Sequence, residues 1–218
     1  MNSVWNGWYT VIFRANVVTD NAPNVTDNVA DMNETVGEAK FLRGWAYFDL
    51  VSMWGGVPLL TTVPKSPAAF QPRASVDAVY TQIIQDLTEA AAVLPGKSAT
   101  DKGRATAAAA NAMLGRVLMQ KGDYTSAKAA FLKIPTTGPD GYSLTDRYLD
   151  NFELATEFNQ ESIFEVVFVD KGDNSYNWGG ESATESQATV RNQEYCPVAW
   201  RNLIPSDKYL NEFESTAT

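Results

Sequence analysis

FLRGWAYFDLVSMWGGVPLL, residues 41–60, places large apolar side chains around most of the circumference of a helix. Its three apolar stripes begin at Phe41, Leu42 and Tyr47 and follow three-to-four residue spacing. A helix that is apolar on nearly all sides is buried on several of them, and each large apolar side chain contributes about 1.5–3 kcal/mol when buried. Gly55, Gly56 and Pro58 then end the helix. The segment therefore predicts a central helix whose aromatic residues belong to the core.

Further helices are expected on both sides of this one, because start and stop signals flank apolar residues at helical spacing. Asp31, with Glu34 three residues later, is expected to cap the central helix. Ser75 and Asp123 are expected to cap two later helices. The other expected helices span residues 5–18, 76–94, 104–120 and 124–134, with a final short helix after IPSD at residues 204–207.

The two helices around Gly122 are joined by a link so short that they must form an antiparallel hairpin. Its residues match the spacing of a tetratricopeptide unit, in which a small residue lies where the helices cross and a large one fills the adjacent groove. The matching positions are Leu114, Gly115, Leu118, Ala127, Phe131 and Pro139. One such unit leaves open a scaffold that binds a peptide segment of a partner protein, although scaffolds of this type repeat the unit three or more times.

Composition excludes several classes of function. The 218 residues carry a net charge of −9, which argues against a nucleic-acid partner. The chain has no histidine, so Ser-His-Asp, Cys-His and most zinc arrangements are ruled out as written. Its single cysteine, Cys196, permits no internal disulfide, which fits a cytosolic protein and equally a large envelope protein. No apolar run is long enough to span a membrane, and the N-terminus does not resemble a signal peptide.

The chain changes character after residue 139. Residues 162–169, SIFEVVFV, are rich in β-branched and aromatic side chains and predict a buried strand. A long polar loop follows, and loops of this length inside a domain are usually functional or disordered. Eleven acidic and two basic residues lie between 140 and 185, which indicates a solvated face or, less often, a surface for a cation or a basic partner. Asp170, Asp173 and Asn174 supply three side-chain oxygens, whereas a calcium site needs six or more, so a bound ion here is left open only as a minor alternative.

Four blocks of the sequence, in order, resemble the SusD/RagB family of glycan-binding outer-membrane lipoproteins. The first is EAKFLRGWAYFDLVSMWGGVPLL, whose matching positions include Glu38, Arg43, Asp49, Gly56 and Pro58. The second is the helical hairpin of residues 103–131. The third and fourth are ESIFEVVF and LIPSDKYLNEFE. The blocks lie in the family's order between residues 38 and 214, which argues against a chance resemblance.

The resemblance implies a mainly α fold, with tetratricopeptide-like hairpins around a buried central helix, long loops and one or two short strands. It implies a single partial domain over residues 1–218, with a helical scaffold over about 1–139 and a loop-rich, ligand-facing region over about 140–218. Family members are longer and begin with a signal peptide and a lipid-modified cysteine, a role that Cys196 lies too deep in the chain to fill. The family also implies a TonB-dependent transporter as partner and a location at the cell surface.

Sugar binding needs an exposed aromatic platform beside polar groups that hold hydroxyls. Because the central helix is expected to be core, the candidate ligand-binding residues are placed in the long loop and just after it. They are the aromatic residues Tyr176, Trp178, Tyr195 and Trp200, with Asn177 and Arg201 as hydrogen-bonding partners. No catalytic residue, metal site or cofactor is expected, although paired carboxylates of a glycosidase cannot be recognised from spacing alone.

Two charged residues of the central helix are expected to have structural roles. Arg43 and Asp49 are six residues apart and do not share a helix face, so they are not expected to pair. Arg43 is instead expected to be a buried anchor for loop carbonyl groups. Glu38 with Arg43, and Asp49 with a later basic residue, are further possible anchors.

The leading hypothesis, which rests on the four ordered blocks and on the lack of a recognisable catalytic group, is a non-catalytic binding protein that captures oligosaccharide and passes it to a transporter.

Overall fold

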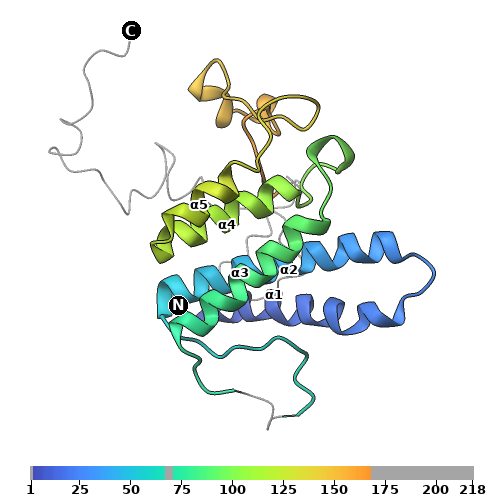
Figure 1. Ribbon diagram of the computed structural model, residues 1–218, viewed down its shortest axis with the longest axis vertical. Coiled ribbons are helices and arrows are strands. Elements are labelled where there is room, and N and C mark those ends of the chain that lie inside the picture. The colour runs from blue at the N-terminus through green and yellow to red at the C-terminus, as the bar shows by residue number, and fades with distance from the viewer. Residues whose placement is uncertain (1, 67–70, 168–218) are drawn as a thin grey trace, which may run out of the picture. The chain divides into compact units, whose positions relative to one another are not determined.

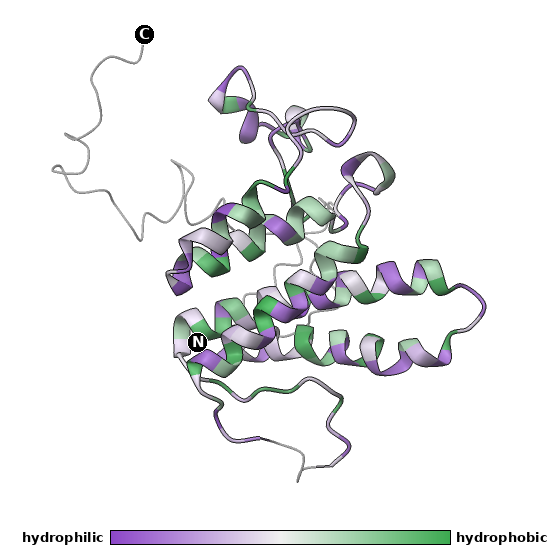
Figure 2. Ribbon diagram, viewed as in Figure 1, coloured by the Kyte–Doolittle hydropathy of each residue, from purple (hydrophilic) through white to green (hydrophobic). Residues whose placement is uncertain are grey.

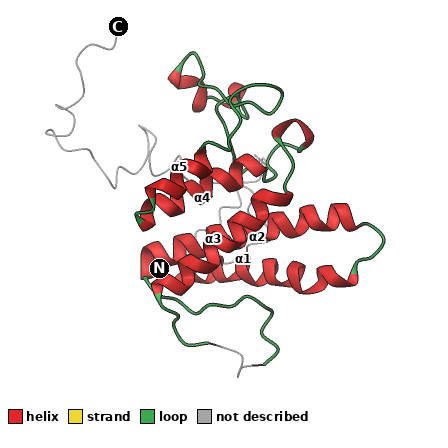
Figure 3. Cartoon of the chain, viewed as in Figure 1, coloured by secondary structure: helices red, strands yellow, loops and turns green. Residues whose placement is uncertain are grey.

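The computed structural model describes residues 2–66 and 71–167 and shows a stack of five helices (Figure 1). The helices are α1 (Asn2–Asn21), α2 (Val29–Trp54), α3 (Val76–Val93), α4 (Ala107–Lys121) and α5 (Tyr124–Phe131). Short 3₁₀ helices cover Ala22–Asn24 (η1), Lys97–Ala99 (η3), Tyr148–Asn151 (η4) and Leu154–Thr156 (η5). The described residues contain no strand, so the prediction of a mainly α fold is confirmed (Figure 3).

Helix boundaries follow local capping chemistry. The Ser75 and Asp123 side chains accept hydrogen bonds from the backbone N–H groups of Ala78 and Ser126, as expected. The prediction that Asp31 caps α2 is wrong by three residues, because the Asn28 side chain caps the helix and accepts from the Asp31 N–H instead. Asp31 therefore lies in the first helical turn, where a negative charge also complements the helix dipole.

Consecutive helices pack against one another along the chain: α1 on α2, α2 on α3, α3 on α4 and α4 on α5. Figure 1 shows α1 and α2 as a long antiparallel pair, joined by a loop over residues 22–28 that contains η1. The central position of α2 places its side chains between two neighbours, which is the arrangement that the aromatic-rich sequence predicts. The chain divides into compact units after Val166, and the fold described here is that of the first.

The core is centred on α2 and α3, and apolar residues run along all five helices between polar ones (Figure 2). Phe41, Tyr47 and Phe48 are buried, which confirms that these aromatic residues are interior packing. The burial is less complete than the sequence predicts, because Leu42 and Met53 on α2 are exposed. The helix is therefore covered on most of its circumference but not on all of it.

The strand expected at residues 162–169 does not form in its described part, residues 162–167. Phe164 instead packs edge-on against Phe41 and Trp45 of α2, with ring centroids 5.2 and 5.6 Å apart. No extended segment among the described residues pairs with this one. Ile163 and Phe164 pack against the helical core, whereas Val166 and Val167 are exposed. The residue composition that favours a strand serves here to attach an irregular segment to the core.

Candidate functional site

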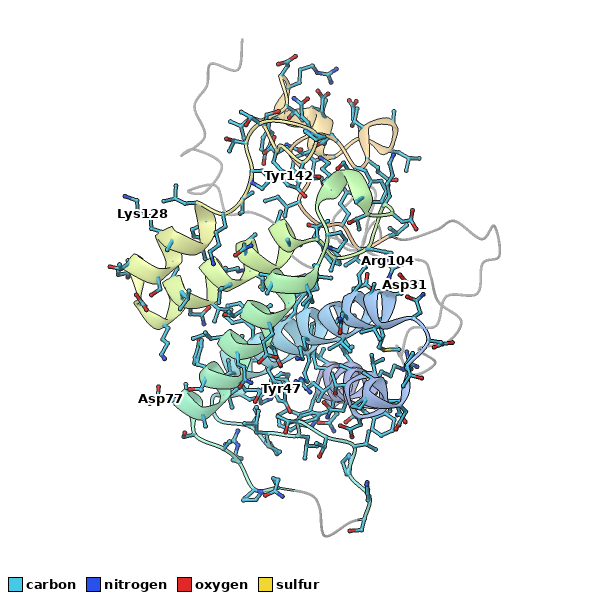
Figure 4. All side chains as sticks on the ribbon, turned by 45° about the vertical axis from the view of Figure 1, so that its right-hand side comes forward. Asp31, Tyr47, Asp77, Arg104, Lys128 and Tyr142 are labelled. Atoms are coloured by element: carbon cyan, nitrogen blue, oxygen red, sulfur yellow. The ribbon has the colours of Figure 1, made fainter. Side chains whose placement is uncertain are left out.

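The candidate site is built on the extended segment that leaves α2, residues 57–64. Gly55 ends the helix with a φ of 70°, a conformation that favours glycine. The Tyr47 hydroxyl, which lies inside the helical stack (Figure 4), donates to the Leu60 carbonyl at 2.9 Å and accepts from the Leu60 N–H at 2.7 Å. The Tyr9 hydroxyl donates to the Pro58 carbonyl at 2.7 Å. Two tyrosines from different helices thus fix the path of this segment.

A buried ion pair lies beneath the same segment. Arg43 of α2 is 5% exposed and Asp86 of α3 is 1% exposed. The Arg43 Nε and Nη2 atoms donate to the two Asp86 oxygens at 2.8 and 2.6 Å. Burial raises the pKa of Asp86, while the hydrogen bonds from Arg43 and Gln82 act against that rise. The two-pronged geometry is that of an ionised pair, so we take Asp86 as a carboxylate at neutral pH.

Arg43 also links this pair to the extended segment. Its Nη1 atom donates to the Asn16 side-chain oxygen at 2.7 Å and to the Thr61 carbonyl at 3.1 Å. The Asn16 amide nitrogen in turn donates to the carbonyls of Leu60 and Thr62 at 3.0 and 3.2 Å. The expectation that Arg43 anchors loop carbonyl groups is thereby confirmed. Its pairing with Asp86 was not foreseen from the sequence, and Glu38, suggested as a partner, pairs with Arg104 instead.

Two adjoining hollows lie along the fixed segment and share Leu60, Pro64 and Gln71 as walls. The first has a volume of about 520 Å³ and is lined mainly by apolar and aromatic side chains. The second has a volume of about 420 Å³ and carries more polar groups. The remaining walls of the first are Trp5, Tyr9, Ile12, Phe13, Asn16 and Pro58, and those of the second include Thr61, Thr62 and Arg73.

The aromatic hollow presents rings that are partly open to solvent. Trp5 lies 4.9 Å from Tyr9 and meets Trp54 edge-on at 5.2 Å, measured between ring centroids. Phe13 is 48% exposed. Aromatic faces beside polar groups suit a ligand with apolar C–H faces and hydroxyl edges. Among residues 2–66 and 71–167, the side chains that line the two hollows are apolar, aromatic, amide, hydroxyl or guanidinium groups, which suit binding of such a ligand.

A second concave surface lies between α3 and the α4–α5 hairpin, with a volume of about 570 Å³. Leu114 and Leu118 of α4 line it together with Ile84 of α3, and Lys121 and Lys133 also contribute to its walls. The hairpin itself has the packing expected of a tetratricopeptide-like unit, with Gly115 facing the Phe131 ring. This surface is the one that a peptide-binding scaffold would use.

The candidate residues chosen from the sequence lie outside the described residues. They are Tyr176, Asn177, Trp178, Tyr195, Trp200 and Arg201, and the segment Asp170–Asn174 lies there too. Sequence reasoning did not single out Trp5, Tyr9 or Phe13, because their spacing fits the buried face of an amphipathic helix equally well. The four-residue steps between these three rings were the available signal, but only the fold shows that they face a hollow.

Among the described residues, no group of three or more acidic or cysteine side chains is arranged to hold a metal ion. In the same part of the chain, every helix falls short of the length and apolar character needed to cross a membrane. Near the hollows, Arg73 donates to the Trp54 carbonyl at 2.9 Å, and the Asp20 carboxylate accepts from the Val63 N–H at 2.8 Å.

Comparisons with known proteins agree on one family. A model of SusD-like proteins, described as starch-binding and associating with the outer membrane, matches residues 1–119. SusD-like protein P25 of Formosa agariphila is 28% identical over 182 residues, which cover 78% of this chain and 32% of that protein. A SusD-like protein of Bacteroides ovatus is 28% identical over 190 residues, covering 79% and 34%. The chain thus spans about a third of the length of these relatives.

Solved structures give the same picture. A laminarin-binding SusD-like protein is 38% identical, with a TM-score of 0.70, and the match covers 77% of this chain and 38% of that one. A structure described as containing a xylogluco-oligosaccharide is 27% identical, with a TM-score of 0.65, and the match covers 76% and 35%. In both comparisons about three quarters of this chain is matched.

Proposed function

The chain belongs to the SusD-like family, and from this premise we propose that it is a non-catalytic protein that binds oligosaccharide at the bacterial cell surface. The observation that carries the proposal is the match to a laminarin-binding protein, at 38% identity and a TM-score of 0.70. Trp5, Tyr9 and Phe13 in the walls of the aromatic hollow supply rings on which a sugar can stack.

We assign the aromatic hollow a share of the sugar-binding surface. A pyranose ring would stack on Trp5 or Phe13, and its hydroxyl groups would face the more polar hollow around Thr61 and Arg73. The buried anchors beneath residues 57–64 hold these walls in place before ligand arrives, which lowers the entropic cost of binding. Tyr176, Asn177, Trp178, Tyr195, Trp200 and Arg201 stay part of the proposal as further ligand-binding residues.

We further propose that the protein delivers the captured oligosaccharide to a TonB-dependent outer-membrane transporter and is held at the outer membrane by a lipid anchor. Support comes from the family resemblance and from the family description, which names association with the outer membrane. Affinity purification of the full-length protein from its own outer membrane, with a search for copurifying TonB-dependent transporters, tests the partnership. Failure of the two to copurify would contradict it.

Isothermal titration calorimetry of the folded protein with laminarin and xyloglucan oligosaccharides tests sugar binding. We expect a Kd for at least one of them, and Phe13→Ala should weaken it about 2- to 10-fold, as the loss of one aromatic contact predicts. Tyr124→Ala removes a more exposed ring from α5, outside the hollow, and is the control. Lack of heat with every glycan would overturn the function, whereas an unchanged Phe13→Ala affinity would overturn only the role of the hollow.

The concave surface on α3, α4 and α5 favours a second candidate, the binding of a peptide segment of a partner protein. Its apolar floor at Leu114 and Leu118 could accept an aliphatic side chain, and its lysines could accept an acidic one. The two candidates differ in a simple measurement. Lys121→Glu/Lys133→Glu, at two exposed positions of the wall, should abolish binding of an acidic peptide at this surface and leave the calorimetric titration with oligosaccharide unchanged.

A further inference from the structure

The loops between α5 and residue 161 expose an unusual amount of apolar surface. Leu144, Tyr148, Leu149, Phe152 and Leu154 are each more than half exposed, with Tyr148 at 80% and Phe152 at 68%. The Tyr148 and Phe152 rings lie against each other with centroids 5.2 Å apart. We call these five side chains the loop patch. Apolar clusters of this kind on a folded domain mark interaction surfaces more often than chance exposure.

The loops that carry the patch are held by hydrogen bonds. The Glu161 carboxylate accepts from the Thr145 N–H and from the Asn151 amide, each at 3.1 Å, and so joins the two ends of the segment. Those bonds also lower the pKa of Glu161. The Gln160 amide donates to the Leu144 carbonyl at 2.8 Å. The patch is therefore presented by a fixed backbone, seen in Figures 1 and 4 as loops apart from α1 and α2.

The surroundings of the patch are strongly acidic. Residues 140–165 hold seven acidic residues and one basic residue, a net charge of −6. Arg147, the one basic residue, is shared between Asp150 at 3.5 Å and Glu153 at 3.2 Å. Asp146 and Glu157 are exposed and form no ion pair within the described part of the chain. The rim of the patch therefore presents uncompensated negative charge.

We propose that the loop patch is a docking surface for a protein whose complementary face has an apolar socket rimmed by lysine and arginine. An apolar, aromatic centre within a charged rim is the usual composition of a specific interface, and opposite charge on the partner adds rate and specificity. A second copy of this chain fits less well, because the same acidic rims would face each other. A sugar also fits less well, because three of the five side chains are leucines, which offer no ring face, and because Asn151 and Glu161 beside the Tyr148 and Phe152 rings already bond to each other.

The test uses a soluble amphipathic peptide with leucine and phenylalanine on one face and lysines flanking them, and a second peptide with glutamates in place of the lysines. Fluorescence anisotropy with the full chain should show binding of the lysine peptide, weaker at high salt, and no binding of the glutamate peptide. Tyr148→Ser/Phe152→Ser and, separately, Asp146→Lys/Glu157→Lys should each weaken binding about tenfold or more.

Matched controls distinguish binding at the loop patch from nonspecific binding to other apolar or acidic parts of the surface. Tyr124→Ser/Leu132→Ser removes two side chains of similar exposure from the α5 region, and Asp27→Lys/Asp101→Lys makes the same charge change at exposed sites elsewhere. Both should bind the lysine peptide within about twofold of the unmodified chain. Equal losses in patch and control variants would overturn the proposal.

Two other outcomes would also overturn it. The first is loss of laminarin-oligosaccharide binding in Tyr148→Ser/Phe152→Ser with peptide binding intact, which would make the patch a sugar platform. The second is concentration-dependent dimerisation in sedimentation velocity that the same variant abolishes.

Circular dichroism of each variant establishes that the comparison is made between folded proteins. The inference is independent of the proposed function, because oligosaccharide titrations of the unmodified chain can fail while peptide binding holds.

Discussion

Arg43 shows how much one side chain does in this protein. It joins three elements, because it bonds Asp86 on α3, Asn16 on α1 and the Thr61 carbonyl of the extended segment from its own place on α2. A buried ion pair is seldom a net gain over well-packed apolar residues, since both charges lose their hydration. The role of the pair here is to position three elements, because the same guanidinium donates to the Asp86 carboxylate, the Asn16 amide oxygen and the Thr61 carbonyl.

Replacing Arg43 alone should lower stability far more than replacing a partly exposed lysine on the same helix. Arg43→Met leaves the Asp86 carboxylate buried without its partner, which should lower the free energy of unfolding by about 3–5 kcal/mol. Lys40→Met breaks the partly exposed pair with Glu89 and should cost about 1 kcal/mol or less. Urea denaturation of both variants measures the difference.

The double variant Arg43→Met/Asp86→Leu separates charge from packing. It removes both buried charges, so it should recover a large part of the stability that Arg43→Met loses. A double variant as unstable as the single one would mean that Arg43 acts mainly by holding Asn16 and Thr61.

The α4–α5 hairpin illustrates the scale of whole elements. Gly122 ends α4 with a φ of 85°, and Asp123 caps α5 immediately afterwards, so the chain reverses within two residues. The helices can then cross closely because Gly115 has no side chain. A Cβ atom built there would lie 2.5 Å from the Phe131 ring, which is closer than atoms can approach. The crossing therefore depends on the smallest residue facing one of the largest.

A larger residue at the crossing should force the hairpin apart. Gly115→Leu is expected to lower the free energy of unfolding by about 1–3 kcal/mol through overpacking. Gly7 of α1 faces open space, so Gly7→Leu should instead raise stability by about 0.5–1 kcal/mol through helix propensity. Thermal or urea unfolding of the pair gives changes of opposite sign if the crossing is tight. Similar gains in both variants would show that Phe131 moves aside without cost.

At the scale of the whole molecule, the five helices form a linear series in which each packs on its neighbours in sequence. Folds of this kind have stability that varies along the series, because end elements have one neighbour and central ones have two. α2 and α3 supply most of the fully buried large side chains. α5 has eight residues and packs chiefly on α4.

This arrangement predicts a gradient of local stability. Amides of α5 should exchange with deuterium through local opening, at a free energy below that of global unfolding, while amides in the middle of α2 should exchange only by global unfolding. Hydrogen exchange followed by mass spectrometry across a low-urea series measures both. Equal protection of α5 and α2 at every urea concentration would show that the helices unfold as one unit.

Sequence alone determined the features that depend on nearby residues. The stop after Trp54, the caps at Ser75 and Asp123, the hairpin around Gly122 and the interior role of the α2 aromatics follow from periodicity and backbone chemistry over a few positions. The family resemblance rests on the same segments. The start of α2 was misplaced because Asn28 and Asp31 are both good capping residues, and local chemistry does not choose between them.

Tertiary structure decided which distant residues meet. Arg43 and Asp86 are 43 positions apart, and nothing in their spacing pairs them. The aromatic hollow forms because Trp5 and Phe13 line it together with Pro58, Leu60 and Pro64. The expected strand does not form in its described part, where Phe164 packs on Phe41 and Trp45 instead. Local preferences act within a turn or two of helix, whereas partners, hollows and exposed patches depend on how all the helices come together, because burial is a property of the whole packed molecule.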